Sequence, residues 1–205
     1  MATAGKLGAV FAPTTDIDGN PDIATTTDNF TGDGTTTTFT LSNEYVSPDN
    51  LTVTVDGTET TDYSINYITG MIEFDNAPGD TLAIEVTYDY IVELEQVGGF
   101  FEWSVDEEAG LEESPEFGDE VITHTRTLDS WSGSASKYFD VEDRFNDWVG
   151  EKVVLGFYID KTAGTEQRFE AWGIIGNKST TTPVDTLVEE DISIEGQTRL
   201  VFRQA

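Results

Sequence analysis

The stretch TLAIEVTYDY, residues Thr81–Tyr90, decides the fold class because its side chains alternate between apolar and polar with a period of two. This period is typical of a half-buried β-strand. The expected buried face carries Leu82, Ile84, Val86 and Tyr88, and the opposite face carries Ala83, Glu85, Thr87 and Asp89. The stretch therefore predicts a strand with one face in a core and the other in water.

Segments upstream of this strand repeat the alternation. TTFTLS (Thr37–Ser42) and LTVTVDG (Leu51–Gly57) both alternate, and the second ends in an Asp-Gly pair that favours a tight hairpin turn. Short segments of this kind, separated by turns, continue from Phe30 to about Ile91. Residues 28–90 therefore predict a small all-β module.

The second half of the chain predicts more strands around one helix. The expected strands are KVVLGFYID (Lys152–Asp160), EQRFEAWGIIGN (Glu166–Asn177), VEEDISIEG (Val188–Gly196) and QTRLVFR (Gln197–Arg203). DVEDRFNDWVG predicts a helix near residues 140–149, because Asp140 suits the N-cap and Gly150 suits the end. Its apolar stripe would consist of Val141, Phe145, Trp148 and Val149. The expected fold class is all-β with one short α-helix.

Charge dominates the composition. The 205 residues include 40 Asp and Glu but 10 Lys and Arg, a net charge of -30, and no basic residue lies between Lys6 and Arg126. Nucleic-acid binding needs clustered Lys and Arg to neutralise phosphates, so this composition disfavours it. A hydrophobic share of 37% is too high for a disordered chain. The acidity is typical of adaptation to a very salty cytoplasm, where salt screens carboxylate repulsion.

Several classes of protein are excluded by what the sequence lacks. It has no cysteine, which excludes disulfides, Cys-ligated zinc and thiol catalysis. It has no apolar stretch of the length that a membrane helix needs, and Met1–Val10 lacks the basic start and apolar run of an export signal. We therefore expect a soluble protein with no membrane contact and no encoded export signal.

Catalysis is weakly indicated. His124, the only histidine, lies in the alternating stretch THTRT and is predicted to be a strand residue rather than a general base. No cysteine or glycine-framed serine accompanies it as a nucleophile. Carboxylates are so frequent that a glycosidase-like pair could not be recognised among them. We predict that the chain is not an enzyme and uses no cofactor.

A metal site is also weakly indicated. In DIDGNPD, Asp16 and Asp18 alternate as in oxygen-rich calcium loops and Asp22 follows, but the glycine and the missing bidentate Glu break the EF-hand register. An Asp/Gly turn is the simpler interpretation, so no metal is expected. N-x-S/T sequons begin at Asn29, Asn50 and Asn177. They could be glycosylated, or they could be accidental in a chain rich in Thr.

A long acidic segment, Asp106–Glu120, follows the predicted strand GFFEWSVDEE. Eight of its fifteen residues are acidic, and Gly110, Pro115 and Gly118 interrupt it, so it predicts an exposed loop. Loops of this length within compact domains are usually functional, and local disorder is the simple alternative.

Between Phe100 and Phe202 the order of elements is distinctive. The strand GFFEWSVDEE is followed by the polar loop, a strand ending LDSWSGSASKYFD, the predicted helix, and a strand with an aromatic-x-Gly pattern. The motif residues are Trp131, Ser132, Gly133, Phe169, Trp172 and Gly173. This order resembles the major tail tube proteins of long-tailed, siphovirus-like phages and archaeal viruses. The resemblance covers the C-terminal half of the chain, with Gly5–Ala12 as the first strand.

In that family two packed sheets flanked by a helix form a subunit, six subunits make a ring, and rings stack into a hollow tube. The resemblance implies a tail-tube β-sandwich or barrel domain from residues 1–27 and 91–205, and one sheet lining the lumen. It implies that the acidic segment reaches a neighbouring subunit or ring. The candidate contact residues are Asp106, Glu107, Glu108, Leu111, Glu112, Glu113, Pro115, Phe117, Asp119 and Glu120.

The resemblance also implies partners and a location. A homohexamer would meet tape-measure, tail terminator and distal tail proteins in the virion tail, after assembly in the host cytoplasm. Double-stranded DNA would pass through without specific binding, and the acidity suggests a halophilic archaeal host. Residues 28–90 depart from the family and resemble the small immunoglobulin-like β modules of virion proteins. We expect them to project outward, since an inward module would block the channel.

Other functions stay open. A tail terminator, a tail-completion protein or a capsid decoration protein would not form long tubes. A cell-surface or secreted β-sandwich binding module would consist of two tandem immunoglobulin-like domains and need an export signal, and an acidic hydrolase would need carboxylates converging in a pocket. Sequence alone leaves Trp131, Tyr138 and Trp172 as either core residues or subunit contacts.

Overall fold

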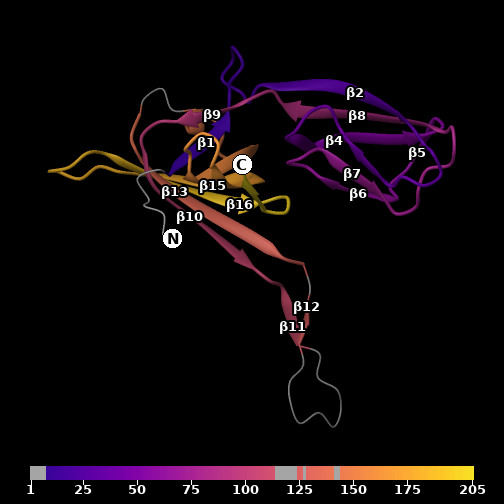
Figure 1. Cartoon of the computed structure of the whole chain (residues 1–205). Helices are drawn as coiled ribbons and strands as arrows, with labels where there is room; N and C mark the ends of the chain where they lie inside the picture. The colour runs from indigo at the N-terminus through magenta and orange to yellow at the C-terminus, as the bar shows by residue number, and fades with distance from the viewer. Residues whose placement is uncertain (1–7, 114–123, 127, 141–143) are drawn as a thin grey trace, which may run out of the picture.

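The computed structural model describes residues 8–113, 124–126, 128–140 and 144–205. Strands dominate these residues and form two regions, a module made by β2 to β8 and a body made by the other strands (Figure 1). The all-β fold class is thereby confirmed. None of the helical residues described forms a helix long and apolar enough to cross a membrane.

The module consists of two small antiparallel sheets around one core. The first has the order β2 (Ile23–Thr31), β8 (Ala83–Ile91), β4 (Val46–Val55) and β5 (Thr58–Glu59). The second has the order β3 (Thr38–Thr40), β7 (Met71–Phe74) and β6 (Tyr63–Asn66). Ile84, Val86 and Tyr88 of β8 are each 1% exposed in the core between the sheets. The alternation of the quoted stretch therefore matches its burial.

The body is one eight-stranded sheet that curls around its own core. Its main path runs β10 (Phe100–Glu108), β13 (Ser130–Tyr138), β16 (Glu189–Gly196), β15 (Gln167–Thr181), β14 (Lys152–Asp160), β1 (Ala9–Pro13) and β9 (Leu94–Val97), with β17 (Val201–Gln204) paired to β15. Val97 from edge strand β9 and Trp103 from edge strand β10 pack against the same cluster as Phe157 of β14. The two edges of the sheet therefore meet one core, as in a partly closed barrel.

The module is inserted between two neighbouring strands of the body. Pro13, the last residue of β1, pairs with Leu94, the first residue of β9. The amide of Thr14 donates to the carbonyl of Glu93 at 3.0 Å. The chain therefore leaves and re-enters the body at adjacent points, so the module stands where a hairpin turn would otherwise join β1 and β9, which is the geometry that tolerates domain insertion.

The predicted α-helix near residues 140–149 is wrong for the part that the structure describes. A 3₁₀-helix covers Arg144–Asn146, and the chain then returns to the sheet, where Val149 bridges to Ile175. Phe145 and Trp148 are each 1% exposed in the body core, as the apolar stripe required, but Val149 is 48% exposed. The burial of the two aromatic rings and the bridge from Val149 to Ile175 of β15 draw the chain back to the sheet, so the helix does not continue. Val141 lies outside the described residues.

The predicted acidic loop is also partly wrong, because its described ends are strands. Residues 106–108 complete β10, and β11 (Leu111–Glu113) pairs with β12 (His124–Arg126), so β10 to β13 form a long hairpin (Figure 1). A two-stranded ribbon surrounded by water can carry charge on both faces, which hides it from pattern analysis. Residues 114–123 lie outside the described part. His124 is a strand residue, as predicted.

A buried carboxylate joins the module to the body. Glu170 of β15 is 0% exposed and accepts the hydroxyl of Tyr45 from the module at 3.0 Å. Arg168 and Arg203 of the body donate to the same carboxylate at 2.7 and 3.1 Å. Arg203 also donates to both oxygens of the module's Glu44, at 2.7 and 2.8 Å. Bidentate charged hydrogen bonds fix geometry as well as energy, so this network sets how the module is oriented on the body.

The network shifts the pKa values of Tyr45 and Arg203. Burial, followed by the charge of Glu170, raises the pKa of Tyr45 well above its ordinary value. The hydrogen bond to Glu44 is the main reason that the pKa of Arg203 is also raised, against the opposing effect of desolvation. Tyr45 therefore stays a hydrogen-bond donor, and Arg203 stays a cation, across the physiological pH range.

An apolar contact lies beside the network. Ile68 and Ile91 of the module pack with Val154 and Trp172 of the body, and none of the four is more than 2% exposed. Burying such side chains stabilises a structure by about 25 cal/mol for each Å² removed from water. Ion pairs and apolar burial thus hold the two regions together.

Replacing Glu170 with Ala should destabilise the protein strongly. The change leaves two arginines and a tyrosine at a largely buried junction without their shared acceptor, and loss of one partner of a buried pair costs about 3 kcal/mol. Urea unfolding of Glu170→Ala measures the loss. The matched control is Glu85→Ala, whose exposed side chain on β8 should change the free energy of unfolding by less than about 0.5 kcal/mol. Equal stability of the two variants would contradict the junction described here.

Candidate assembly surfaces

The tryptophan of the Trp-Ser-Gly motif packs at the base of the long hairpin, where β13 joins the sheet of the body. Trp131 is 5% exposed, and its indole N–H donates to the carbonyl of Thr198 at 2.7 Å. A Cβ atom added to Gly173 would lie 3.1 Å from the indole ring and 2.5 Å from Cγ2 of Ile194, and one added to Gly196 would lie 2.5 Å from the ring. Glycine at both positions is what allows the ring to lie flat against the sheet.

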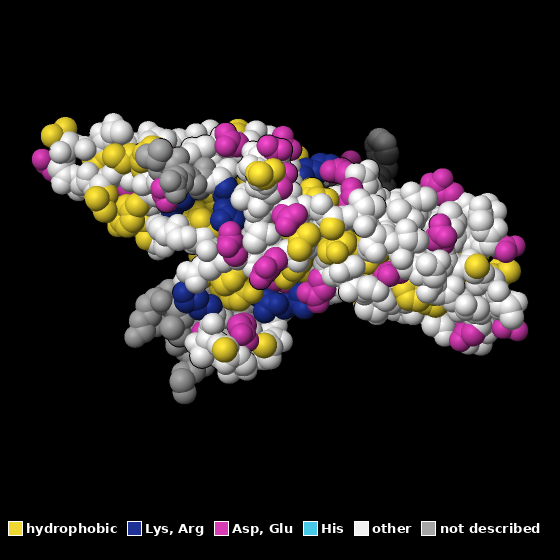
Figure 2. Space-filling view, turned by 90° about the horizontal axis from the view of Figure 1, so that it is seen from above, with side chains coloured by type: hydrophobic (Ala, Val, Ile, Leu, Met, Phe, Trp, Pro, Cys, Tyr) yellow, Lys and Arg dark blue, Asp and Glu magenta, His cyan; other side chains and the backbone are white. Residues whose placement is uncertain are grey.

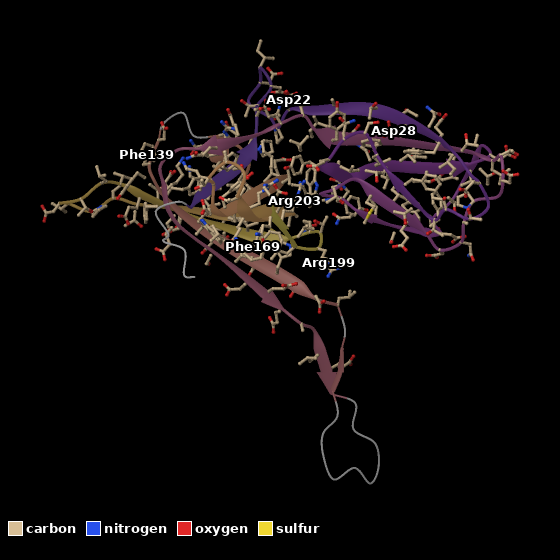
Figure 3. All side chains as sticks on the ribbon, viewed as in Figure 1. Asp22, Asp28, Phe139, Phe169, Arg199 and Arg203 are labelled. Carbon is tan, nitrogen blue, oxygen red and sulfur yellow. The ribbon has the colours of Figure 1, made fainter. Side chains whose placement is uncertain are left out.

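The structure separates the motif residues into two groups. Trp131, Gly133 and Gly173 come together on the core side of the sheet. Phe169, on the same side of β15, packs against that core and against the half-exposed ring of Phe202 at 5.3 Å (Figure 3). Ser132 faces solvent and Trp172 faces the module. The question left by the sequence is thus answered for Trp131 and Trp172, which are core residues, while Tyr138 is 42% exposed.

The long hairpin leaves the body as a ribbon of two strands. β13 pairs with β16 only from Ser132 onward, and the outer edge of β10 pairs with no strand among the described residues. Leu111 is 64% exposed and Leu128 is 91% exposed on this ribbon. A two-stranded ribbon is at best marginally stable in water by itself. Its exposed leucines and free edge are therefore a surface suited to contact with another molecule.

Five of the acidic residues predicted to make subunit contacts, Asp106, Glu107, Glu108, Glu112 and Glu113, lie on this ribbon. Asp106, Glu107, Glu108 and Glu112 are exposed. Glu113 is described as a strand residue through its backbone alone. Pro115, Phe117, Asp119 and Glu120 lie outside the described residues.

A second projection is the hairpin between β15 and β16. Its turn, residues 182–188, is exposed throughout except for the half-buried Val188, with Val184 99% and Leu187 62% exposed. A buried ion pair anchors the root of this hairpin: Lys178 contacts Glu190 at 2.8 Å, with side chains 8% and 1% exposed. Figure 1 shows the hairpin leaving the body on the side away from the module. Apolar side chains at the tip of a firmly anchored projection form a second candidate contact surface.

Most described cations are used inside the chain. Arg144 pairs with Glu95, Lys152 with Asp49, and Arg168 with Glu170. Figure 2 shows acidic side chains spread over the visible face, including the module, which has no Lys or Arg. The surface is therefore anionic with few free positive charges, which leaves little to bind phosphates.

The candidate metal residues form a closed turn. Asp16 accepts hydrogen bonds from the amides of Asp18 and Asn20, each at 2.9 Å. Desolvation raises the pKa of Asp16, but hydrogen bonds from Asn20 and Asp18 outweigh it, and the net pKa lies below the ordinary value. Asp22 accepts, through its backbone carbonyl, the amide of Val92. In the described ranges no group of three or more His, Asp or Glu residues is arranged to hold a metal ion.

Comparisons with known proteins give likenesses to solved structures alone. No family model and no curated protein matches the chain. One similar structure is the tail of an empty gene transfer agent particle refined with C6 symmetry, with a TM-score of 0.42, 13% identity, and coverage of 54% of this chain and 86% of that chain. Another is the virion of a native gene transfer agent particle, with a TM-score of 0.43, 12% identity, and coverage of 54% and 88%. Both scores lie below 0.5, so the function is inferred from the chain's own residues.

The packing of Trp131 on the sheet leads to a stability prediction. Gly173→Ala should cost about 1–3 kcal/mol, because the added methyl meets Ile194 and the indole ring and forces the core to shift. Urea unfolding measures the change. Gly98→Ala is the control, since a Cβ at Gly98 meets nothing within 4 Å. If the two variants are equally stable, the close approach of Trp131 to β15 is refuted.

Proposed function

We propose that this protein is a structural subunit of a virion tail tube, which self-assembles into stacked rings and forms the conduit for genomic DNA. The observation that carries the proposal is the two-stranded ribbon from β10 to β13, with its free edge and its exposed Leu111 and Leu128. A ribbon of this kind gains stability by packing on another subunit. The order of elements and the Trp-Ser-Gly strand support the same assignment, through their resemblance to tail tube proteins.

The electrostatics support a conduit. Acidic side chains dominate the surface, and the described arginines and lysines are largely paired with carboxylates or amides within the chain. A wall of this composition offers phosphates no binding site and repels them, so double-stranded DNA can slide past it. The module, which is attached by a rigid junction, projects outward in this proposal and leaves the lumen free.

Self-assembly is the direct test. The purified protein is imaged by negative-stain electron microscopy at rising concentration, and hollow tubes of stacked rings are expected. Single rings that never stack would instead indicate a tail terminator or completion protein. Monomers under all conditions would contradict the proposal and favour a surface binding module.

The ribbon gives a sharper prediction. Leu111→Asp combined with Leu128→Asp should leave the monomer folded but abolish tubes, because charge at an apolar contact cannot be buried without a large penalty. Circular dichroism checks the fold and electron microscopy counts tubes. The control is Ile17→Asp, which places a charge at a fully exposed apolar residue in the loop before the module and should assemble normally. Tubes of normal length from the double variant would exclude the ribbon as the contact.

Assembly should depend on salt. Subunits with a net charge of -30 repel one another strongly at low ionic strength, because the Debye length is about 10 Å at 0.1 M salt. The repulsion is much weaker at 1 M salt, where the Debye length is about 3 Å. We expect the concentration needed for tubes to fall as NaCl rises from about 0.1 to about 1 M. Light scattering measures that concentration. A threshold that stays constant or rises with salt would show that charge repulsion does not control assembly, and would count against a halophilic host.

A further inference from the structure

A groove runs between the module and the body. Its volume is about 300 Å³, and its walls come from β6 and β7 of the module and from the segment that leads into β17. Ile65, Tyr67, Met71 and Val201 supply apolar surface, Arg199 supplies a cation, and Glu73 is a lining carboxylate. Met71 is 43% exposed. Ser64, Asn66 and Thr198 also line the groove. It is therefore an open slot of mixed polarity, with an apolar patch, one arginine and one carboxylate.

Arg199 differs from the other basic side chains. Among the Lys and Arg residues whose side chains the structure describes, which leaves out Arg126, it is the one for which the structure gives no hydrogen bond, ion pair or ring contact. Arg203, four residues later, is paired with both Glu44 and Glu170. Figure 3 shows Arg199 in the angle between the module and the long hairpin, pointing away from the body. In so acidic a protein, an exposed arginine without an internal partner is a place where a carboxylate from outside would be attracted.

The turn at residues 182–188 has the complementary features. Val184 and Leu187 expose almost all and most of their apolar surface, and Asp185 lies between them in sequence. The buried pair of Lys178 and Glu190 holds the root of the hairpin, so the tip is presented by a rigid element. Two apolar side chains beside one carboxylate match the apolar patch and the arginine of the groove.

We propose that the 182–188 turn of one copy enters the groove of a second copy, with Asp185 paired to Arg199 and with Val184 and Leu187 packed on Tyr67, Met71 and Val201. The 182–188 turn lies on the side of the body away from the module (Figure 1), whereas residues of β6 and β7 of the module line the groove. A contact between two different surfaces is head-to-tail, and such contacts close into rings when the rotation between copies allows it. This inference rests on the proposed self-assembly and names the contact within a ring.

Charge reversal tests the pairing. Arg199→Asp and Asp185→Arg should each raise the concentration needed for assembly by about tenfold or more, because each places like charges together in the contact. The double variant Arg199→Asp with Asp185→Arg should restore assembly, since the pair is re-formed with its charges exchanged. The controls are Lys161→Asp, at an exposed position just after β14, and Glu85→Arg, at an exposed position on β8. They make the same changes of net charge elsewhere and should assemble like the wild type.

The outcomes separate this contact from the proposed function. If the wild type never assembles, both the tail-tube function and the contact are overturned. If the wild type forms tubes and either single reversal assembles equally well, or the double variant fails to recover, the contact is overturned and the function stands. Recovery in the double variant alone supports the pairing.

Disulfide capture gives a second readout, which is clean because the natural chain has no cysteine. Val184→Cys with Met71→Cys in the same chain should give a ladder of cross-linked species beyond the dimer under mild oxidation, because a head-to-tail contact joins each copy to two neighbours. Either cysteine alone can give dimers at most. A double variant that stops at dimers, or does not cross-link while tubes form, would overturn the proposed contact.

Discussion

The carboxylate of Glu170 is buried at the meeting point of the two halves of the molecule, and the alternation of a single strand places it there. Along β15, Ala171 and Gly173 face the body core, while Glu170 and Trp172 face the module. In a strand that is buried on both faces, alternate residues must each fit a different neighbouring surface, here the body core and the module. Glu170 is tolerated because two arginines and a tyrosine surround it. A shift of β15 by one residue in register would turn its apolar side chains toward the ion pairs and turn Glu170 toward the body core. Both the contact with the core and the contact with the module would then be lost.

The same core controls the two projections from the body. The long hairpin is fixed at its base by the indole of Trp131 lying against glycines of β15 and β16, and the shorter hairpin by the pair of Lys178 and Glu190. Anchoring of this kind lowers the entropic cost of ordering a projection when it meets a partner. The body can therefore hold surfaces that are not stable by themselves in an orientation suited to assembly.

The net charge of -30 limits how copies of this protein can approach one another. Nearly every described cation is engaged within the chain, so copies of the protein face one another with carboxylates. In the proposed assembly, the exposed apolar side chains of Leu111, Leu128 and Val184 would provide the attraction, and salt or the exposed Arg199 would lower the repulsion. This division would allow a strongly acidic chain to self-assemble in the way proposed above.

The sequence alone determined the all-β class and most strands, because a period of two follows from local geometry and was unmistakable in Thr81–Tyr90. It did not determine elements that distant contacts create. The helix signals around Asp140–Gly150 were overridden by the burial of Phe145 and Trp148 and by the bridge to Ile175. The acidic end of β10 and the start of β11 lacked a pattern because Asp106, Glu107, Glu108 and Glu112 are exposed on both faces. Three features join residues that are far apart in the chain: the junction at Glu170, the packing of Trp131 against Gly173 and Gly196, and the groove at Arg199. The tertiary structure alone therefore decided them.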